Sequence, residues 1–303
     1  MSLTAAPTAS RPSPSGGGKA TSDPTAAVAA WAVRCLLLEL ETWPKPGLVS
    51  HVDTGSHHDM DADTFHRSAA AIEPHFVAMV AAGQRCSGMG QLRTIGLEAE
   101  TAMLAATGGV NTHRGAIFGL GLLCAAAGAR ASGAVSPSLS LGAVVTQLWG
   151  HEIINGPVTL HSNGQTVRRR YGAGGASSEA VQGFPSIYNV GLPALQLGRQ
   201  LAPGDSEAAR VQACFALIAV LEDTNLLHRG GSAGLGFAQT IAHAFIERGG
   251  VGRPAWGAQA HMVHQAFTAR KLSPGGSADL LAMTLFVDAL ELSSAPHAGR
   301  CDR

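Results

Sequence analysis

The chain has 303 residues, of which 46% are hydrophobic and only 14% are charged, and its 21 Lys and Arg are balanced by 21 Asp and Glu. A chain without excess positive charge is not expected to bind nucleic acid through a basic surface, so any anion site must be local. No apolar run reaches the length of a membrane-spanning helix without polar interruption, so we expect no membrane association. The five cysteines lie far apart without metal-binding spacing, which indicates free thiols in a reducing, cytoplasmic compartment.

The first segment of the chain, residues 1–24, is rich in Ala, Ser, Pro and Gly and has almost no large apolar residue. Such a segment cannot bury enough surface to offset the entropy lost on ordering, so we expect it to be disordered. Its cations Arg11 and Lys19 do not precede an apolar segment, which argues against a signal peptide. Residues 25–295 are expected to form one catalytic domain, followed by a flexible tail at 296–303.

From residue 25 onward the apolar residues recur at helical spacing, and no segment alternates as a strand would. Thr25 is the expected N-cap of the first helix, and Asp61 or Asp63 that of the second, which Pro74 should kink. The long stretch 151–190 is expected to be irregular. The prediction is an all-α, single-domain bundle of about nine or more helices, with a glycine-rich site built from loops. The predicted helices are 26–41, 63–82, 92–106, 112–129, 139–150, 206–221, 233–247, 255–269 and 277–293.

Five short stretches combine glycine with charged or polar side chains in this otherwise Ala/Leu-rich chain. Glycine lets backbone N–H groups approach a ligand, cations suit phosphate oxygens, and carboxylates suit hydroxyl protons or Mg²⁺. Together the stretches predict one polyphosphate-binding centre assembled from distant loops. They are residues 42–49, 55–60, 109–115, 223–231 and 272–280.

The first two stretches follow the first helix. Two prolines stiffen the backbone around Lys45, so its ammonium could contact phosphate. The simpler interpretation is that the prolines end the helix and that Lys45 is solvated. In the second stretch, neighbouring aspartates can cap the next helix, which leaves His57 and Asp59 without a structural task. Because Mg²⁺ prefers carboxylate oxygen to imidazole, Asp59 is the better metal candidate.

The other three stretches border helix ends. Thr112 can cap the helix that follows it, and the first-turn N–H groups of this helix would form an anion site beside Arg114. The alternative is a capped helix on which Arg114 is only a surface residue. Asp223 is predicted at a helix C-terminus, where the dipole disfavours a carboxylate, so a functional role is favoured. Ser277 is the expected N-cap of the last helix, and Asp279 could simply complement its dipole.

These five stretches, in this order, resemble the triphosphoribosyl-dephospho-CoA synthase family over about residues 29–290. The matching segments are PKPGLV, GxHxDM, GVNTHRGxIF, DTN followed by RGG, and SPGGSADLL. The resemblance implies an all-α enzyme in which ATP donates its ribose triphosphate to 3′-dephospho-CoA, adenine leaves, and Mg²⁺ is expected. The product would supply the prosthetic group of an acyl carrier subunit; Trp43 and the His228 form of the RGG segment favour malonate decarboxylase over citrate lyase.

The chain departs from the family pattern at two positions. Ser177 stands where the family usually has Arg, although Glu179 is kept, which weakens phosphate binding by this loop unless one of residues 168–170 substitutes. Arg114 stands where many members have Lys, and a guanidinium fork does not automatically replace a point charge.

The resemblance implies a reaction that breaks the bond between ribose C1′ and adenine N9, through an oxocarbenium-like state. It needs a base for the attacking 2′-hydroxyl, a donor for the departing adenine, and cations for the triphosphate. The catalytic candidates are Asp279, Glu39 and Glu179 as the base and His113 as the adenine-side donor, and the Mg²⁺ candidates are Asp59 and Asp223. The substrate-binding candidates are Lys45, Gly47, His57, Asn111, Thr112, Arg114, Asn225, Arg229, Gly230, Gly231, Ser273, Gly275, Gly276 and Ser277.

Two other classes of protein fit the same residues. A Mg²⁺-dependent hydrolase would use the carboxylates to activate water at a ribosyl bond, and it would release adenine without dephospho-CoA. A helical protein that only binds a nucleotide would give no new product. A homo-oligomer is possible, because Ala/Leu-rich helices can expose a dimer face.

Overall fold

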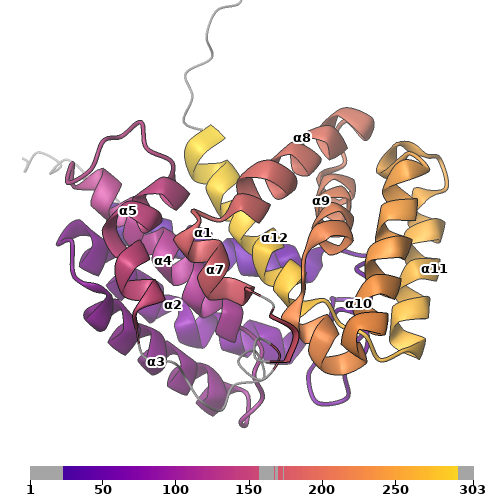
Figure 1. The fold of residues 1–303 in the computed structure, drawn as a ribbon, viewed down its shortest axis with the longest axis horizontal. Coiled ribbons are helices and arrows are strands. Elements are labelled where there is room, and N and C mark those ends of the chain that lie inside the picture. Colours follow the sequence, from indigo (N-terminus) through magenta and orange to yellow (C-terminus); the bar gives the residue numbers. More distant parts are fainter. Residues whose placement is uncertain (1–22, 157–166, 168–169, 173, 293–303) are drawn as a thin grey trace, which may run out of the picture.

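The computed structural model describes residues 23–156, 167, 170–172 and 174–292. In this part of the chain every regular element is a helix and there is no strand, which confirms the predicted all-α fold (Figure 1). The α-helices are α1 (Pro24–Glu41), α2 (Ala62–Gln84), α3 (Met89–Ala106), α4 (Arg114–Ala131), α5 (Leu141–Ile154), α7 (Gly175–Val181), α8 (Leu192–Leu201), α9 (Ser206–Val220), α10 (Thr224–Glu247), α11 (Trp256–Ala269) and α12 (Gly275–Val287). The short elements are the π-helices η1 (Ile187–Gly191) and η3 (Asp288–Leu292) and the 3₁₀-helix η2 (Gly250–Gly252). Of the segment 1–24 predicted to be disordered, residues 1–22 lie outside the described residues, as does the tail 296–303. Asp23 and Pro24 instead form the start of α1.

The stretch 151–190, expected to be irregular, contains α7 and most of η1, and α8 follows without a predicted counterpart. The sequence of α7 consists mostly of small residues and buries only Ala180, so it carries no apolar stripe. In α8 a proline stands in the first turn, where its missing N–H costs nothing and its fixed φ suits a helix. The short α7 is therefore easily overlooked in the sequence, whereas the proline of α8 is a helix-start signal that the prediction did not use.

The first two helix starts show how capping works in this chain. Asp61 caps α2 as expected, accepting from the Thr64 N–H at 2.9 Å. The expected cap Thr25 is wrong: Asp23 caps α1 and accepts from the Thr25 N–H at 2.9 Å. The helix starts two residues earlier than predicted because Pro24 is pre-organised for a first helical position.

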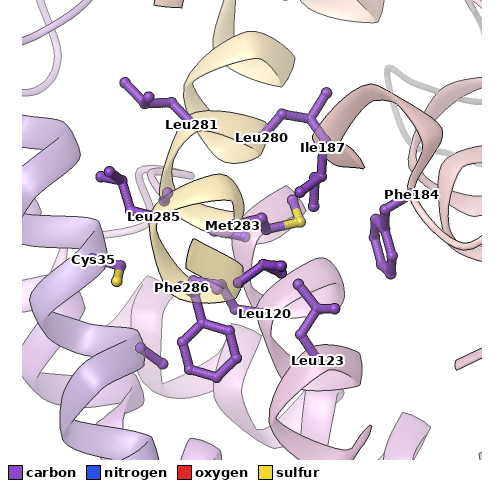
Figure 2. Packing of buried hydrophobic residues seen from close by; sticks show 14 of the residues in the cluster. Cys35, Leu120, Leu123, Phe184, Ile187, Leu280, Leu281, Met283, Leu285 and Phe286 are labelled. Atoms are coloured by element: carbon purple, nitrogen blue, oxygen red, sulfur yellow. The ribbon is translucent and has the colours of Figure 1, made fainter. Parts of the chain in front are cut away.

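Helix α12 lies at the centre of the molecule, with α2–α5 to one side, α8–α11 to the other, and α1 packed against it (Figure 1). Its residues from Leu280 to Val287 are all buried, as expected for a helix that is apolar all round. Figure 2 shows Leu285 on the side of Cys35 in α1, while Met283 points toward Ile187 and Phe184. The approach of α4 is close, since a Cβ at Gly119 would lie 2.3 Å from the Met283 sulfur.

This packing determines where the functional stretches meet. The apolar faces of the helices share one large core, and α12 contacts α1, α4, α9 and α10. The starts of α4, α10 and α12 thereby reach the same region of the molecule. Among the helices that the structure describes, none combines the length and apolar character needed to span a bilayer.

Candidate active site

A cavity of about 900 Å³ lies where α1, α4, α7, α10 and α12 meet the loop around residues 48–60. The first turns of α4, α10 and α12 contribute Gly115, Thr224 and Gly275 to its wall. The positive end of the helix dipole lies at each helix N-terminus, so three of them around one cavity favour negative charge. Asp223 and Asp279 supply part of this charge, because they accept hydrogen bonds from N–H groups at these helix starts.

Most of the predicted site residues line this one cavity. They are Glu39, His57, Asn111, Thr112, His113, Arg114, Glu179, Asp223, Asn225, Arg229, Ser273, Gly275, Gly276 and Asp279. The others lie off its wall: Lys45, Gly47, Gly230 and Ser277 do not line it, and Gly231 lines a separate cavity beside Tyr171. Asp59 also lies outside the wall, with a side chain that is 64% exposed and 3.6 Å from His57 Nδ1.

Lys45 lies beneath the cavity and does not present its ammonium to solvent. Its side chain is fully buried, and Nζ donates to Glu39 Oε1 at 2.5 Å and to the Glu39 carbonyl oxygen at 2.7 Å. The loop can turn inward because Gly47 has a φ of +66°, and a Cβ there would lie 2.0 Å from the Leu272 carbonyl oxygen. Burial raises the pKa of Glu39, and the Lys45 charge opposes this rise. The expectation of a phosphate-facing Lys45 is therefore corrected to a buried ion pair beneath the cavity.

Asp223 is the N-cap of α10, not a residue at the end of α9 as expected. Its Oδ1 accepts from the N–H groups of Asn225 at 2.9 Å and Leu226 at 3.4 Å. The start of α10 was hidden in the sequence because Gly231, with a φ of 59°, interrupts the helix and resembles a loop.

The second oxygen of Asp223 joins α10 to α12. Oδ2 accepts from the Ser277 N–H at 2.8 Å and from the Ser277 hydroxyl at 3.1 Å. Ser277 is therefore not the N-cap of α12, which begins at Gly275, two residues earlier. Each oxygen of the Asp223 carboxylate already accepts two hydrogen bonds, which leaves little capacity to bind a metal ion.

Asp279 projects from α12 against the start of α4. Its carboxylate accepts a hydrogen bond from the Ala116 N–H, and a Cβ at Gly115 would lie 2.0 Å from Oδ2. The carboxylate thus meets the N-terminus of a neighbouring helix and not, as expected, only its own. Burial raises the pKa of Asp279 well above its usual range, and the charges of Glu39 and Asp223 raise it further.

His113 is the N-cap residue of α4, a position predicted for Thr112. The Thr112 hydroxyl donates instead to Ser68 in α2 at 2.7 Å, and Ser68 Oγ lies 2.6 Å from His113 Nδ1. Burial, together with the Lys45 charge, lowers the pKa of His113 to about 3, so the imidazole is neutral at physiological pH.

The remaining polar groups of the wall are engaged with neighbours. Arg114 Nε donates to Glu100 at 2.8 Å, and Glu179 accepts from the Ser186 hydroxyl at 2.6 Å. Arg229 donates to the Lys271 carbonyl oxygen and lies against His57, whose Nε2 is 2.9 Å from Ser273 Oγ. Burial and then the Arg229 charge lower the pKa of His57, which favours its neutral form.

Carboxylates outnumber cations on the cavity wall. Among its described residues, Arg114 and Arg229 are the basic side chains apart from histidine. The acidic ones are Glu39, Glu100, Glu179, Glu222, Asp223 and Asp279. The described residues contain no group of three or more His, Cys, Asp or Glu that could hold a metal ion by itself. Of residues 168–170, considered as substitutes for the missing family arginine, only Arg170 is described, and it is exposed beside the Tyr171 ring.

Several residues of the site were missed in the sequence. Ser68 and Glu100 come from α2 and α3, which contain none of the glycine-rich stretches, and a single polar residue on a helix gives no signal of its own. An apolar part of the wall was also missed because its members come from four separate segments. It comprises Met60, Phe65, Leu97 and Phe118.

The fold and the site define an all-α protein with a carboxylate-rich cavity surrounded by helix N-termini, which is typical of an enzyme acting on a phosphorylated substrate. Residues 25–297 match the model of the ATP:dephospho-CoA triphosphoribosyl transferase family. The chain therefore belongs to this family, which confirms the resemblance seen in the sequence, and it is an enzyme of the pentosyltransferase class.

Three curated relatives carry the name probable 2-(5''-triphosphoribosyl)-3'-dephosphocoenzyme-A synthase. The protein from Pseudomonas putida is 42% identical over 269 residues, which cover 86% of this chain and 93% of the relative. The one from Azotobacter vinelandii is 42% identical over 267 residues, covering 86% and 90%. The one from Acinetobacter calcoaceticus is 38% identical over 245 residues, covering 80% and 84%. No solved structure matches the chain at a significant level.

Proposed function

We propose that this enzyme transfers the triphosphoribosyl group of ATP to the 2′-hydroxyl of 3′-dephospho-CoA and releases adenine. The single observation that supports this most is the convergence of the glycine-rich stretches on one cavity, where three helix N-termini face a set of carboxylates of which Glu39 and Asp223 are buried. In the proposed reaction the 2′-oxygen bonds to ribose C1′ while the C1′–N9 bond breaks. One proton leaves the hydroxyl and one proton is taken up by adenine, so the step is balanced.

Two carboxyl groups of the cavity suit these two proton transfers. Burial raises the pKa of Glu39, but the paired Lys45 ammonium opposes this rise and favours the ionised form, which suits the base that accepts the 2′-hydroxyl proton. Asp279 has no cation partner among the described residues and holds its proton far more strongly than an ordinary aspartate. It suits the acid that protonates adenine. Two carboxyl groups whose environments separate their pKa values are a recurring way to divide acid and base roles.

The anionic part of ATP fits the helix N-termini, with Arg114 and Arg229 beside them. Because carboxylates outnumber these arginines, a triphosphate would meet net repulsion unless a divalent cation came with it. Mg²⁺ suits this donor set, since it is commonly held by one or two carboxylates together with substrate phosphates, and it would neutralise the triphosphate when bound. Asp59, exposed beside His57, is the candidate that keeps free oxygens, whereas those of Asp223 are engaged.

The reaction is tested by incubating the chain with ATP, 3′-dephospho-CoA and Mg²⁺. We expect free adenine and, by mass spectrometry, a CoA product heavier by one triphosphoribosyl unit, and we expect both to disappear with excess EDTA. Adenine released without dephospho-CoA would favour the hydrolase, and tight ATP binding with no product would favour the nucleotide-binding protein.

We further propose that the product serves the acyl carrier subunit of malonate decarboxylase. The support is the sequence form around Trp43 and His228; neither residue lines the main cavity. Deleting the gene should abolish growth on malonate and spare growth on citrate. The reverse result would assign the product to citrate lyase.

The position of Asp279 can be tested through Gly115. Replacing Gly115 by Ala places a methyl group 2.0 Å from Asp279 Oδ2, so the carboxylate must move, and adenine release should fall about 10–100-fold. Gly90→Ala is the matched control, because Gly90 is also the second residue of a helix but has nothing within 4 Å of an added Cβ. The control should keep full activity and gain up to about 1 kcal/mol of stability. Wild-type adenine release by Gly115→Ala would contradict the assignment.

A further inference from the structure

Ser68 is a buried hydroxyl on the core-facing side of α2. Its side chain has no exposed surface, and its helix neighbours Ala69 and Ile72 belong to the apolar core. A hydroxyl in such a place needs hydrogen-bond partners, because an unpaired one costs about 1–3 kcal/mol. Its partners are Thr112 Oγ1 at 2.7 Å and His113 Nδ1 at 2.6 Å, both at the start of α4.

The directions of these bonds determine where the imidazole proton lies. Thr112 donates its hydroxyl proton to Ser68 Oγ, so Ser68 keeps its own proton for His113 Nδ1. The ring is neutral and accepts at Nδ1, and its proton is therefore on Nε2. The opposite tautomer would require the first bond to reverse, with Ser68 donating to Thr112 Oγ1.

The other ring nitrogen is available to a ligand. His113 lines the cavity. Its Nε2 has no hydrogen-bond partner in the described part of the chain, and this nitrogen is not fully buried. It therefore reaches the cavity space. The ring is held edge-on against Phe65, with centroids 5.0 Å apart, and the backbone N–H of His113 donates to the Met103 sulfur at 3.2 Å.

We propose that Ser68 is a positioning residue, and that the chain Thr112–Ser68–His113 holds a neutral imidazole with its Nε2–H directed at an acceptor atom of the bound nucleotide. This inference rests on the proposed function and deepens it. A neutral imidazole donates a hydrogen bond without giving up its proton. His113 would therefore act beside Asp279, the proposed acid, and would not replace it. The acceptor is a purine nitrogen or a phosphate oxygen, two atoms that share the same chemistry.

The tautomer can be read directly in ¹⁵N-histidine-labelled full-length protein by long-range ¹⁵N–¹H correlation, with His113→Gln identifying the signal. We expect one Nε2–H tautomer from pH 5 to pH 9. In Ser68→Ala we expect mixed tautomers and a kcat for adenine release about tenfold lower at unchanged KM, since one hydrogen bond is lost. Thr112→Val, which keeps Ser68, should give a smaller change in the same direction. Adenine alone or tripolyphosphate alone, added to the wild-type protein, should shift the Nε2–H signal, and whichever shifts it identifies the acceptor.

Thr284→Ala is the matched control, because Thr284 is equally buried but donates only to the Leu280 carbonyl oxygen of its own helix. It should leave the His113 tautomer and kcat unchanged. A Nδ1–H tautomer in the wild-type protein, or a single Nε2–H tautomer with normal kcat in Ser68→Ala, would overturn the inference. The NMR result needs no turnover, so a chain that released no adenine would end the proposed function while the tautomer still decided the role of Ser68.

Discussion

Replacing Asp279 by Asn is expected to lower the rate of adenine release by about 10²–10⁴-fold while making the folded chain more stable at alkaline pH. The loss of rate follows from removing the acid that protonates the leaving base, because general acid catalysis is typically worth that much. The amide can still accept the Ala116 N–H, so the variant should fold normally.

The gain in stability follows from proton linkage. In the unfolded chain the carboxyl has an ordinary pKa of about 3.9, whereas burial raises it well above that range in the folded chain. Between these two values the folded state binds more protons, so stability falls as the pH rises. The neutral amide removes this cost. Thermal unfolding of the wild-type protein and of Asp279→Asn should show a higher Tm for the variant, and the difference in Tm should be larger at pH 8.5 than at pH 5.

Asp61→Asn is the control with the opposite sign. Hydrogen bonds from Thr64 lower the pKa of Asp61, so its contribution to stability is present above its unfolded pKa and is lost as the pH falls through its folded pKa. This variant should be less stable at pH 7 and approach the wild-type protein at strongly acidic pH. A Tm difference for Asp279→Asn that does not depend on pH would show that the carboxyl is not protonated in the way we infer.

Replacing Lys45 by Met is expected to lower the free energy of unfolding by about 3–5 kcal/mol, because it leaves the buried Glu39 carboxylate without its cation. Adding Glu39→Gln to this variant should recover most of the stability, since no buried charge is then unpaired. Adenine release should stay low in both, because the base is protonated in the first and absent in the second. Urea unfolding together with the adenine assay measures both effects.

This double variant also separates two roles for Lys45. If its ammonium instead bound phosphate, as expected from the sequence, Lys45→Met would raise the KM for ATP and leave stability nearly unchanged. Glu39→Gln would then give no recovery. Recovery of stability without recovery of activity is the outcome that supports a buried pair serving Glu39.

The helices themselves were largely predictable, because an apolar stripe at helical spacing is a local property of the sequence. The cap of α2 at Asp61 was predictable for the same reason, since it depends on residues a few positions apart. The missed α7 and the hidden start of α10 mark the limit of this approach. In α7 there is no stripe, and in α10 a glycine with positive φ lies within the helix.

The family could be recognised from the residue types and order of the short stretches alone. The surroundings of each side chain became visible only in the folded chain. Lys45 and Asp223 were expected to face ligands, yet Lys45 neutralises a buried glutamate and Asp223 ties two helix starts together. Ser68 gave no signal until packing brought α2 against the start of α4. The physical reason is that burial and hydrogen-bond partners set the charge and role of a polar group, and both depend on residues distant in the chain.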